Sequence, residues 1–314
     1  MTQVTEARAV LPTDLLALVA HRRDYPNEAW TRERLGVAGP AAPGLGLALD
    51  QVRALARRRG VWVSTHFQRL KGLAGARERG GKQAWEIDYL IDATEEHDAV
   101  AGLLDCAVGD VGRGGGEKLF LRLGESSPLL PRVLGAGFML YQQESLYARV
   151  GIAAGEATGL RRMEPADSYP AYRLYNSTTP ESVRRLEAAT FSEWHAAQER
   201  RGLRNGAQFV RDRDGRLDAV VRIARLPQGV AIDLVCENPA SGDVESLVRS
   251  ALGAVAGSNL PAFILTPSAG ALVTALEGAG FDHQGEYVSL VRRTARPVTL
   301  PKLVPAIAKT AVGV

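Results

Sequence analysis

One long internal repeat constrains this sequence more than any other feature. The tetrapeptide Gly-Ala-Gly-Phe occurs at residues 135–138 and again at 278–281, 143 positions later (278 minus 135). The dipeptide Ile-Asp occurs at 87–88 and at 232–233, 145 positions later (232 minus 87). Two landmarks that keep nearly the same register predict two similar halves rather than one large domain.

Both halves show the same order of expected elements, judged from apolar periodicity and turn residues. The first half gives a strand at 85–92, an apolar helical pattern through 100–107, a strand at 119–123, a helix at 126–134 and a strand at 140–150. The second half repeats this order with a strand at 230–236, a helix through 244–255, a strand at 262–266, a helix at 268–277 and a strand at 284–292. Helices at 14–23, 48–59 and 179–201, a strand at 61–67 and a hairpin at 208–224 precede these units.

The length of 314 residues also fits two medium domains, since a domain commonly has about 150 residues. We place the boundary in the Gly- and Pro-containing linker 151–170, which gives domains at 1–160 and 161–297 and an apolar tail at 298–314. So many aliphatic residues would be costly to leave in water. This favours docking of the tail on the other half or on a second copy in a homodimer, with a disordered tail as the alternative.

The composition excludes several classes of protein. A formal net charge of +3 is too small to predict nucleic-acid or membrane binding by the whole chain. The absence of a signal peptide pattern and of a long apolar run predicts a cytoplasmic protein. Cys106 and Cys236 are too far apart for a disulfide framework or a metal motif, and the five histidines have no ligand spacing, so no metal is expected.

The order of elements, ending in a Gly-Phe pair at 137–138 and at 280–281, resembles the acyl-CoA N-acyltransferase family, known as GNAT. The resemblance covers most of residues 5–296, and tandem GNAT proteins are a known arrangement. It implies an α/β (α+β) fold with two tandem GNAT-like domains, each a mixed, mostly antiparallel sheet flanked by helices. It also implies acetyl-CoA or another acyl-CoA as cofactor and a small amine as substrate.

In this family the strand before the long helix splays from the next strand, and the pantetheine arm of CoA lies in the cleft. A glycine-rich loop then offers backbone N–H groups to the pyrophosphate. The matching segments here, 93–98 and 238–245, carry carboxylates instead, which predicts two weak CoA sites. By resemblance we assign cofactor contacts to six residues of the second half: Leu234, Val235, Ser241, Gly242, Asp243 and Val244.

Candidate catalytic residues are few. The family's frequent tyrosine acid is matched by Val133 and Leu276, which cannot donate a proton. The position of a common family asparagine falls on Ser126, which keeps a polar side chain, and on an alanine in the second half. Cys236 and Glu237 end the strand where acyl transfer would occur, so they complete the candidates with Ser126.

The segment 53–82 carries nine basic residues and a single acid, Glu78, with aromatic residues interleaved. Such a pattern is typical of a polyanion-binding surface, and we expect weak, salt-dependent binding through basic residues of this segment. A solvated basic hairpin is the alternative. The residues assigned to the partner are Arg57, Arg58, Arg59, Arg69 and Lys71.

Three functions remain open from the sequence. The first is a divergent N-acyltransferase with one working half, and the second is a scaffold or ligand sensor that has lost CoA binding. The third is polyanion binding. In either of the first two cases we expect at least one of the two clefts to be closed, by side chains or by the tail, because an empty apolar slot is unfavourable.

Overall fold

The computed structural model describes residues 7–11, 14, 25–35, 59–66, 69–94, 96–151, 159–199, 206–255 and 261–294, with the side chains of Gln198, Glu199, Ser241, Ala254 and Val255 left out. Most of the helices expected at 14–23 and 48–59 lies outside these residues. The tail 298–314 and the basic residues Arg57 and Arg58 lie outside them as well.

The described chain forms one 12-stranded sheet in the order β1-β2-β3-β4-β5-β12-β6-β11-β10-β9-β8-β7. The N-terminal half contains β1 Ala7–Ala9, η1 Arg32–Arg34, β2 Arg59–His66, β3 Arg69–Gly81, β4 Ala84–Asp92, α3 Ala99–Arg113, β5 Lys118–Gly124, α4 Leu130–Gly135 and β6 Met139–Arg149. The C-terminal half contains β7 Arg161–Arg162, η2 Pro165–Asp167, α5 Ser168–Thr178, α6 Glu181–Glu187, α7 Phe191–Glu199, β8 Ala207–Arg213, β9 Arg216–Leu226, β10 Gly229–Cys236, α8 Ser241–Val255, β11 Ala262–Pro267, α9 Ala271–Gly278 and β12 Asp282–Arg293.

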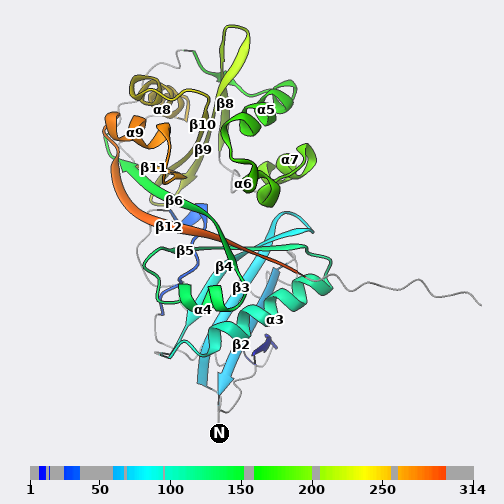
Figure 1. The fold of residues 1–314 in the computed structure, drawn as a ribbon. Helices are drawn as coiled ribbons and strands as arrows, with labels where there is room; N and C mark the ends of the chain where they lie inside the picture. Colours follow the sequence, from blue (N-terminus) through cyan, green and yellow to red (C-terminus); the bar gives the residue numbers. More distant parts are fainter. Residues whose placement is uncertain are drawn as a thin grey trace, which may run out of the picture.

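The two halves exchange their final strands. β12 of the C-terminal half pairs with β5 of the N-terminal half, while β6 of the N-terminal half pairs with β11 of the C-terminal half. β6 and β12 also pair with each other along most of their length, and Figure 1 shows them crossing the middle of the molecule. The sheet is therefore continuous from one half into the other.

The exchanged strands also enter the opposite cores. The main core of the N-terminal half packs the sheet against α3, and it includes Val288 and Leu290 from β12. The core of the C-terminal half packs the sheet against α8 and α9, and it includes Tyr147 from β6. Each half thus buries apolar surface on a strand that belongs to the other half.

The expected helix–strand order of both repeats is confirmed. α3 buries Val100, Leu103, Leu104 and Ala107, the stripe expected from the sequence. The two Gly-Phe stops use the positive φ angles of Gly137 (79°) and Gly280 (74°), which glycine adopts without steric cost. The turn between β8 and β9 places Asp214 (φ 52°) and Gly215 (φ 74°) as a primed hairpin turn requires.

Two expectations about the front of the C-terminal half were wrong. The helix expected over 179–201 is two helices, α6 and α7, because Thr190 starts a new one: its hydroxyl accepts the Glu193 N–H (3.2 Å) and Glu193 accepts the Thr190 N–H (3.2 Å). The expected linker 151–170 also ends earlier, since η2 begins at Pro165 and α5 at Ser168, and that proline stands at the first position of η2.

Helices lie on both faces of the C-terminal half. Figure 1 shows α8 and α9 on one face and α5, α6 and α7 on the other. α7 contacts β3 and α6 contacts β6, so two helices of the C-terminal half also pack on strands of the N-terminal half. This bridge brings residues of both halves to the same region.

The exchange of strands makes a prediction about stability. Replacing Leu290, which is fully buried in the core of the N-terminal half, by Ala should reduce the free energy of unfolding by about 2–5 kcal/mol. Amide exchange in α3 should rise with it. Leu140 lies opposite Leu290 in the sheet but is 45% exposed, so Leu140→Ala is the matched control and should change stability by less than about 0.5 kcal/mol. Equal losses in both variants would refute the shared core.

Candidate functional site

Both halves contain the expected splayed pair of parallel strands. β4 and β5 pair only from Ala84↔Lys118 to Glu86↔Phe120, although β4 continues to Asp92. β10 and β11 pair only from Val230↔Ala262 to Ile232↔Ile264, although β10 continues to Cys236. Each half therefore has one strand whose distal end is not paired by its parallel neighbour. The two halves differ in what lies in the resulting gap.

In the N-terminal half a segment of the chain itself fills the gap. The Glu28 N–H donates to the Leu90 carbonyl of β4 (2.9 Å), and the Trp30 N–H donates to the Arg122 carbonyl of β5 (2.9 Å). Residues 28–30 thus bridge the two strands that have separated. One cleft was expected to be closed by side chains or by the tail 298–314, and this one is closed by the backbone of an N-terminal segment instead.

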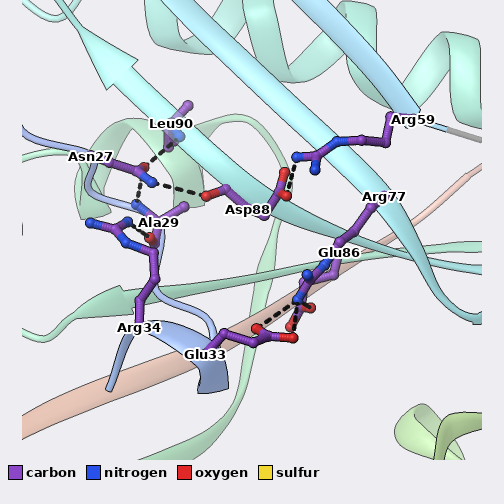
Figure 2. A network of polar contacts seen from close by, with 9 residues as sticks. All are labelled: Asn27, Ala29, Glu33, Arg34, Arg59, Arg77, Glu86, Asp88 and Leu90. Carbon is purple, nitrogen blue, oxygen red and sulfur yellow. Dashed lines mark hydrogen bonds and ion pairs between the residues drawn. The ribbon is translucent and has the colours of Figure 1, made fainter. Parts of the chain in front are cut away.

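Asn27 fixes this segment against β4, as Figure 2 shows. Its side-chain amide donates to the Asp88 carbonyl (2.9 Å), and its Oδ1 accepts the N–H groups of Leu90 (2.9 Å) and Ala29 (3.0 Å). The side chain is buried, so these bonds satisfy polar groups that water does not reach. One asparagine therefore does for β4 what a neighbouring strand would do.

In the C-terminal half the gap opens into a cavity of about 500 Å³. One wall is the splayed end of β10 with β11 and the start of α9, and the other is formed by α5, α6 and α7. Apolar lining comes from Leu234, Leu265, Leu272 and Trp194. A cavity of this size is typical of small-molecule sites, which are mostly apolar with a few placed polar groups.

The floor of this cavity is charged and comes from both halves. Arg32, Gln142 and Glu144 of the N-terminal half line it together with Arg222 and Asp233 of the C-terminal half. Asp233 forms ion pairs with Arg222 (3.2 Å) and with Arg32 (3.4 Å). These residues are not among the candidates predicted from the sequence, although a charged residue inside an apolar strand, such as Asp233 in β10, is a usable signal.

The candidate residues from the sequence are only partly brought together. Leu234, Val235, Cys236 and Glu237 line the cavity. Ser126 is exposed in the turn between β5 and α4, in the half whose gap is filled, and it is not part of the cavity lining. Ser241 and Gly242 begin α8, and Val244 is buried in the core of the C-terminal half.

The carboxylate at the start of α8 faces cations. Asp243 forms ion pairs with Arg213 (3.2 Å) and Arg211 (3.4 Å), both from β8. Arg211 is held in turn by Asp218 (2.8 Å). The negative charge that was expected to repel a pyrophosphate here is therefore matched by two guanidinium groups.

Cys236 is a poor nucleophile in this environment. Burial raises the pKa of its thiol above the ordinary value, and this outweighs the lowering by Arg211, whose Nη2 lies 3.9 Å from Sγ. The thiolate is the reactive form, and the raised pKa keeps this thiol protonated at neutral pH. Glu237 follows the last residue of β10, is exposed, and belongs to the cavity lining.

Much of the basic segment points inward. Arg77 pairs with Glu33 (2.8 Å) and Glu86 (3.1 Å), Arg79 pairs with Glu187 (3.0 Å), and Arg59 pairs with Asp88. Arg69 is exposed and Lys71 is half-buried. Arg59, one of the residues assigned to a polyanion, therefore faces a carboxylate of its own chain, and polyanion binding remains a proposal that rests on the others.

No group of three or more His, Cys, Asp or Glu residues within the described ranges converges as a metal site would require. No helix among those residues is long and apolar enough to cross a membrane.

Comparisons with known proteins identify the fold. No family model matches the sequence, and no curated protein does. Among solved structures, a tandem GNAT protein from the clavulanic acid biosynthesis pathway is 12% identical, with a TM-score of 0.53 over 93% of this chain and 99% of that one. This chain has the tandem GNAT fold.

Two more GNAT-type structures agree. A GCN5-related N-acetyltransferase from Sphaerobacter thermophilus is 13% identical, with a TM-score of 0.54 over 93% of this chain and 97% of that one. A putative acetyltransferase from Pyrococcus horikoshii is 10% identical, with a TM-score of 0.52 over 94% of this chain and 91% of that one. At these identities the likeness concerns the fold, and the site must be argued from its residues.

The filled gap of the N-terminal GNAT unit predicts a large effect of Asn27→Ala. The change leaves the buried Leu90 N–H and Asp88 carbonyl without this partner, and each such group costs about 1–3 kcal/mol. We expect the free energy of unfolding to fall by about 2–4 kcal/mol in chemical denaturation. The exposed Asn238 gives the control variant Asn238→Ala, and equal stability of the two variants would contradict the account.

A pH prediction follows from Asp88 in the same gap. Burial raises its pKa to about 6, despite the lowering by Arg59, from an ordinary value of 3.8. The folded chain keeps this proton where the unfolded chain has lost it, so the stabilising contribution is full below about pH 4 and is lost as pH rises through 6. The unfolding free energy of wild type relative to Asp88→Asn should therefore fall by up to about 3 kcal/mol between pH 4 and pH 7. Parallel pH profiles would show that Asp88 does not titrate in this way.

Proposed function

We propose that the chain is a CoA-dependent N-acyltransferase whose C-terminal half carries the active site. The observation that carries this proposal is the difference between the halves: one splayed strand pair opens onto a cavity of about 500 Å³, and the other is filled by Asn27 and residues 28–30. The N-terminal half then has a structural role. It supplies part of the cavity floor and closes the sheet.

The residues present fit an acyl-CoA. The edge of β10 from Asp233 to Cys236 is not paired by β11, and an extended amide-containing arm can bond to such an edge as a strand would. Leu234, Leu265 and Leu272 give the surrounding apolar contact. Arg211 and Arg213 stand at the start of α8, where the phosphates of the cofactor belong in this fold, and they would have to exchange Asp243 for phosphate.

When bound, acyl-CoA would supply a thioester carbonyl for attack by the nitrogen of an amine. In the overall reaction a C–N bond forms, the C–S bond breaks, and the proton given up by the amine balances the thiolate that leaves. The chain's part is to hold the amine in neutral form and to exclude water. Glu237, which belongs to the cavity lining, is the carboxylate that we assign to accept the amine proton.

The chemistry proceeds by direct attack in this proposal. A covalent route through the enzyme would need a thiolate at Cys236, and the raised pKa of that thiol opposes it. Cys236 then serves as apolar packing at the end of β10. The alternative, a fold that has lost its cofactor, predicts instead that the chain does not bind acetyl-CoA.

The test uses a matched pair of tryptophan substitutions. Ala271 is exposed at the start of α9 and lines the cavity, so Ala271→Trp should weaken acetyl-CoA binding at least tenfold in isothermal titration, by filling the entrance. Pro128, 143 positions earlier (271 minus 128), is the equivalent exposed position beside the filled gap. Pro128→Trp should leave binding unchanged.

Longer acyl-CoAs belong in the same titration, since the acyl chain is not specified by the site. Wild-type chain that binds none of these compounds would overturn the proposal and favour the non-catalytic alternative. Equal loss in both tryptophan variants would place the cofactor elsewhere.

A further inference from the structure

Arg32 belongs to the N-terminal half but reaches the floor of the cavity in the C-terminal half. It lies in the short helix η1, two residues after Trp30. Its side chain is 25% exposed, and its guanidinium lies 3.4 Å from the Asp233 carboxylate of β10. The segment that fills one gap of the molecule therefore also places a cation in the other half's cavity.

The backbone around Arg32 is held on both sides. On one side Trp30 is bonded to Arg122 of β5 (2.9 Å). On the other, Leu35 is buried and its carbonyl accepts the side-chain amide of Gln228 (2.6 Å). Glu33 is ion-paired with Arg77 (2.8 Å). A side chain presented by so constrained a turn is preorganised, which reduces the entropy lost when it binds a ligand.

Among the charged residues of the cavity floor, Arg32 is the cation left over after each carboxylate has been paired with one arginine. Glu144 is matched by Arg122 (2.7 Å), Glu187 by Arg79 (3.0 Å), and Asp233 by Arg222 (3.2 Å). Within the described part of the chain Arg32 forms one ion pair, the 3.4 Å contact with the same Asp233. Glu237 adds another carboxylate to the cavity lining, but it is exposed after the end of β10, where water and salt screen its charge. In the floor itself two guanidinium groups share the carboxylate of Asp233, and an anion is the ligand that this local balance favours.

We propose that the acceptor of acyl transfer is an amine that also carries a carboxylate, such as an amino acid, and that Arg32 binds this carboxylate beside Arg222. The assignment rests on the proposed function of the same cavity. A guanidinium can bind a carboxylate through two parallel N–H···O hydrogen bonds. Arg32 makes only a long contact with Asp233, so this two-bond geometry stays available for a ligand carboxylate. Trp194 and Leu265 leave an apolar wall for the rest of the acceptor.

A purely cationic acceptor is disfavoured by the same contacts. Glu144 is deeply buried and bonded to both Arg122 and Ser289, and its pKa is lowered by that arginine against the effect of burial. Glu187 accepts hydrogen bonds from Arg79 and Tyr141. A cation that binds in the floor, away from Glu237, would have to displace one of these partners and leave a buried charge behind, which is costly.

The experiment compares carboxylates with carboxamides on the full-length chain. Glycine, L-alanine, L-leucine and L-phenylalanine, and the carboxamide of each, are titrated calorimetrically with and without saturating acetyl-CoA. A hydrogen-bonded carboxylate should bind about tenfold to hundredfold tighter than its carboxamide. Arg32→Gln should remove this preference, and Arg32→Lys should restore part of it because the charge returns.

Arg173 provides the control variant. It is an exposed arginine of α5 outside the cavity lining, so Arg173→Gln should keep the full preference for carboxylates. Thiol release from acetyl-CoA gives a second reading, in which Arg32→Gln raises KM for the acceptor more than it lowers kcat.

The outcomes separate the two proposals. A carboxylate preference that depends on Arg32 in a chain that does not bind acetyl-CoA would support the anion site and end the acyltransferase proposal. Acetyl-CoA binding with equal affinity for carboxylates and carboxamides, or with no binding of either, would overturn the anion site alone. A preference unchanged in Arg32→Gln would also overturn it.

Discussion

The pairing of β12 with β5, and of β6 with β11, is the constraint on which the rest of this structure depends. Each half ends its own sheet with an open strand edge, and an open edge is a row of unpaired N–H and C=O groups. The other half's final strand satisfies that edge. The two repeats are thereby fixed in one sheet, with β6 and β12 at its centre and the cavity beside them.

The second constraint is the splay of β4 and of β10. A strand that leaves its neighbour must find other partners for its backbone, because buried polar groups without hydrogen bonds are expensive. The N-terminal half meets this need from within, through Asn27 and residues 28–30. In the C-terminal half the same geometry stays open to a ligand. The unpaired end of the splayed strand is therefore covered by the protein's own chain in the N-terminal half and borders a cavity in the C-terminal half.

The sequence predicts local structure well and long-range contacts poorly. The repeats of Gly-Ala-Gly-Phe and the turn at Asp214 and Gly215 are local signals, and the elements around them are where the sequence predicts them. The contact of Asn27 with Leu90 joins residues 63 positions apart, and no local sequence pattern predicts it. The contact between Arg32 and Asp233 in the cavity floor is not predicted from the sequence for the same reason. The strand exchange is not predicted because β6 and β12 would show the same alternation of apolar and polar residues whichever half they joined.

The exchange has a consequence for the order in which the chain can fold as it is made. β5 ends at Gly124, but the strand that covers its edge begins at Asp282, 158 positions later (282 minus 124). The N-terminal half therefore emerges from the ribosome long before its sheet can be completed. During that interval the edge of β5 and the apolar surface that later contacts Leu290 stay uncovered. Unpaired strand edges and exposed apolar surface promote aggregation and are bound by chaperones. Closure of this fold is necessarily late, and pairings of such high sequence separation are slow to form.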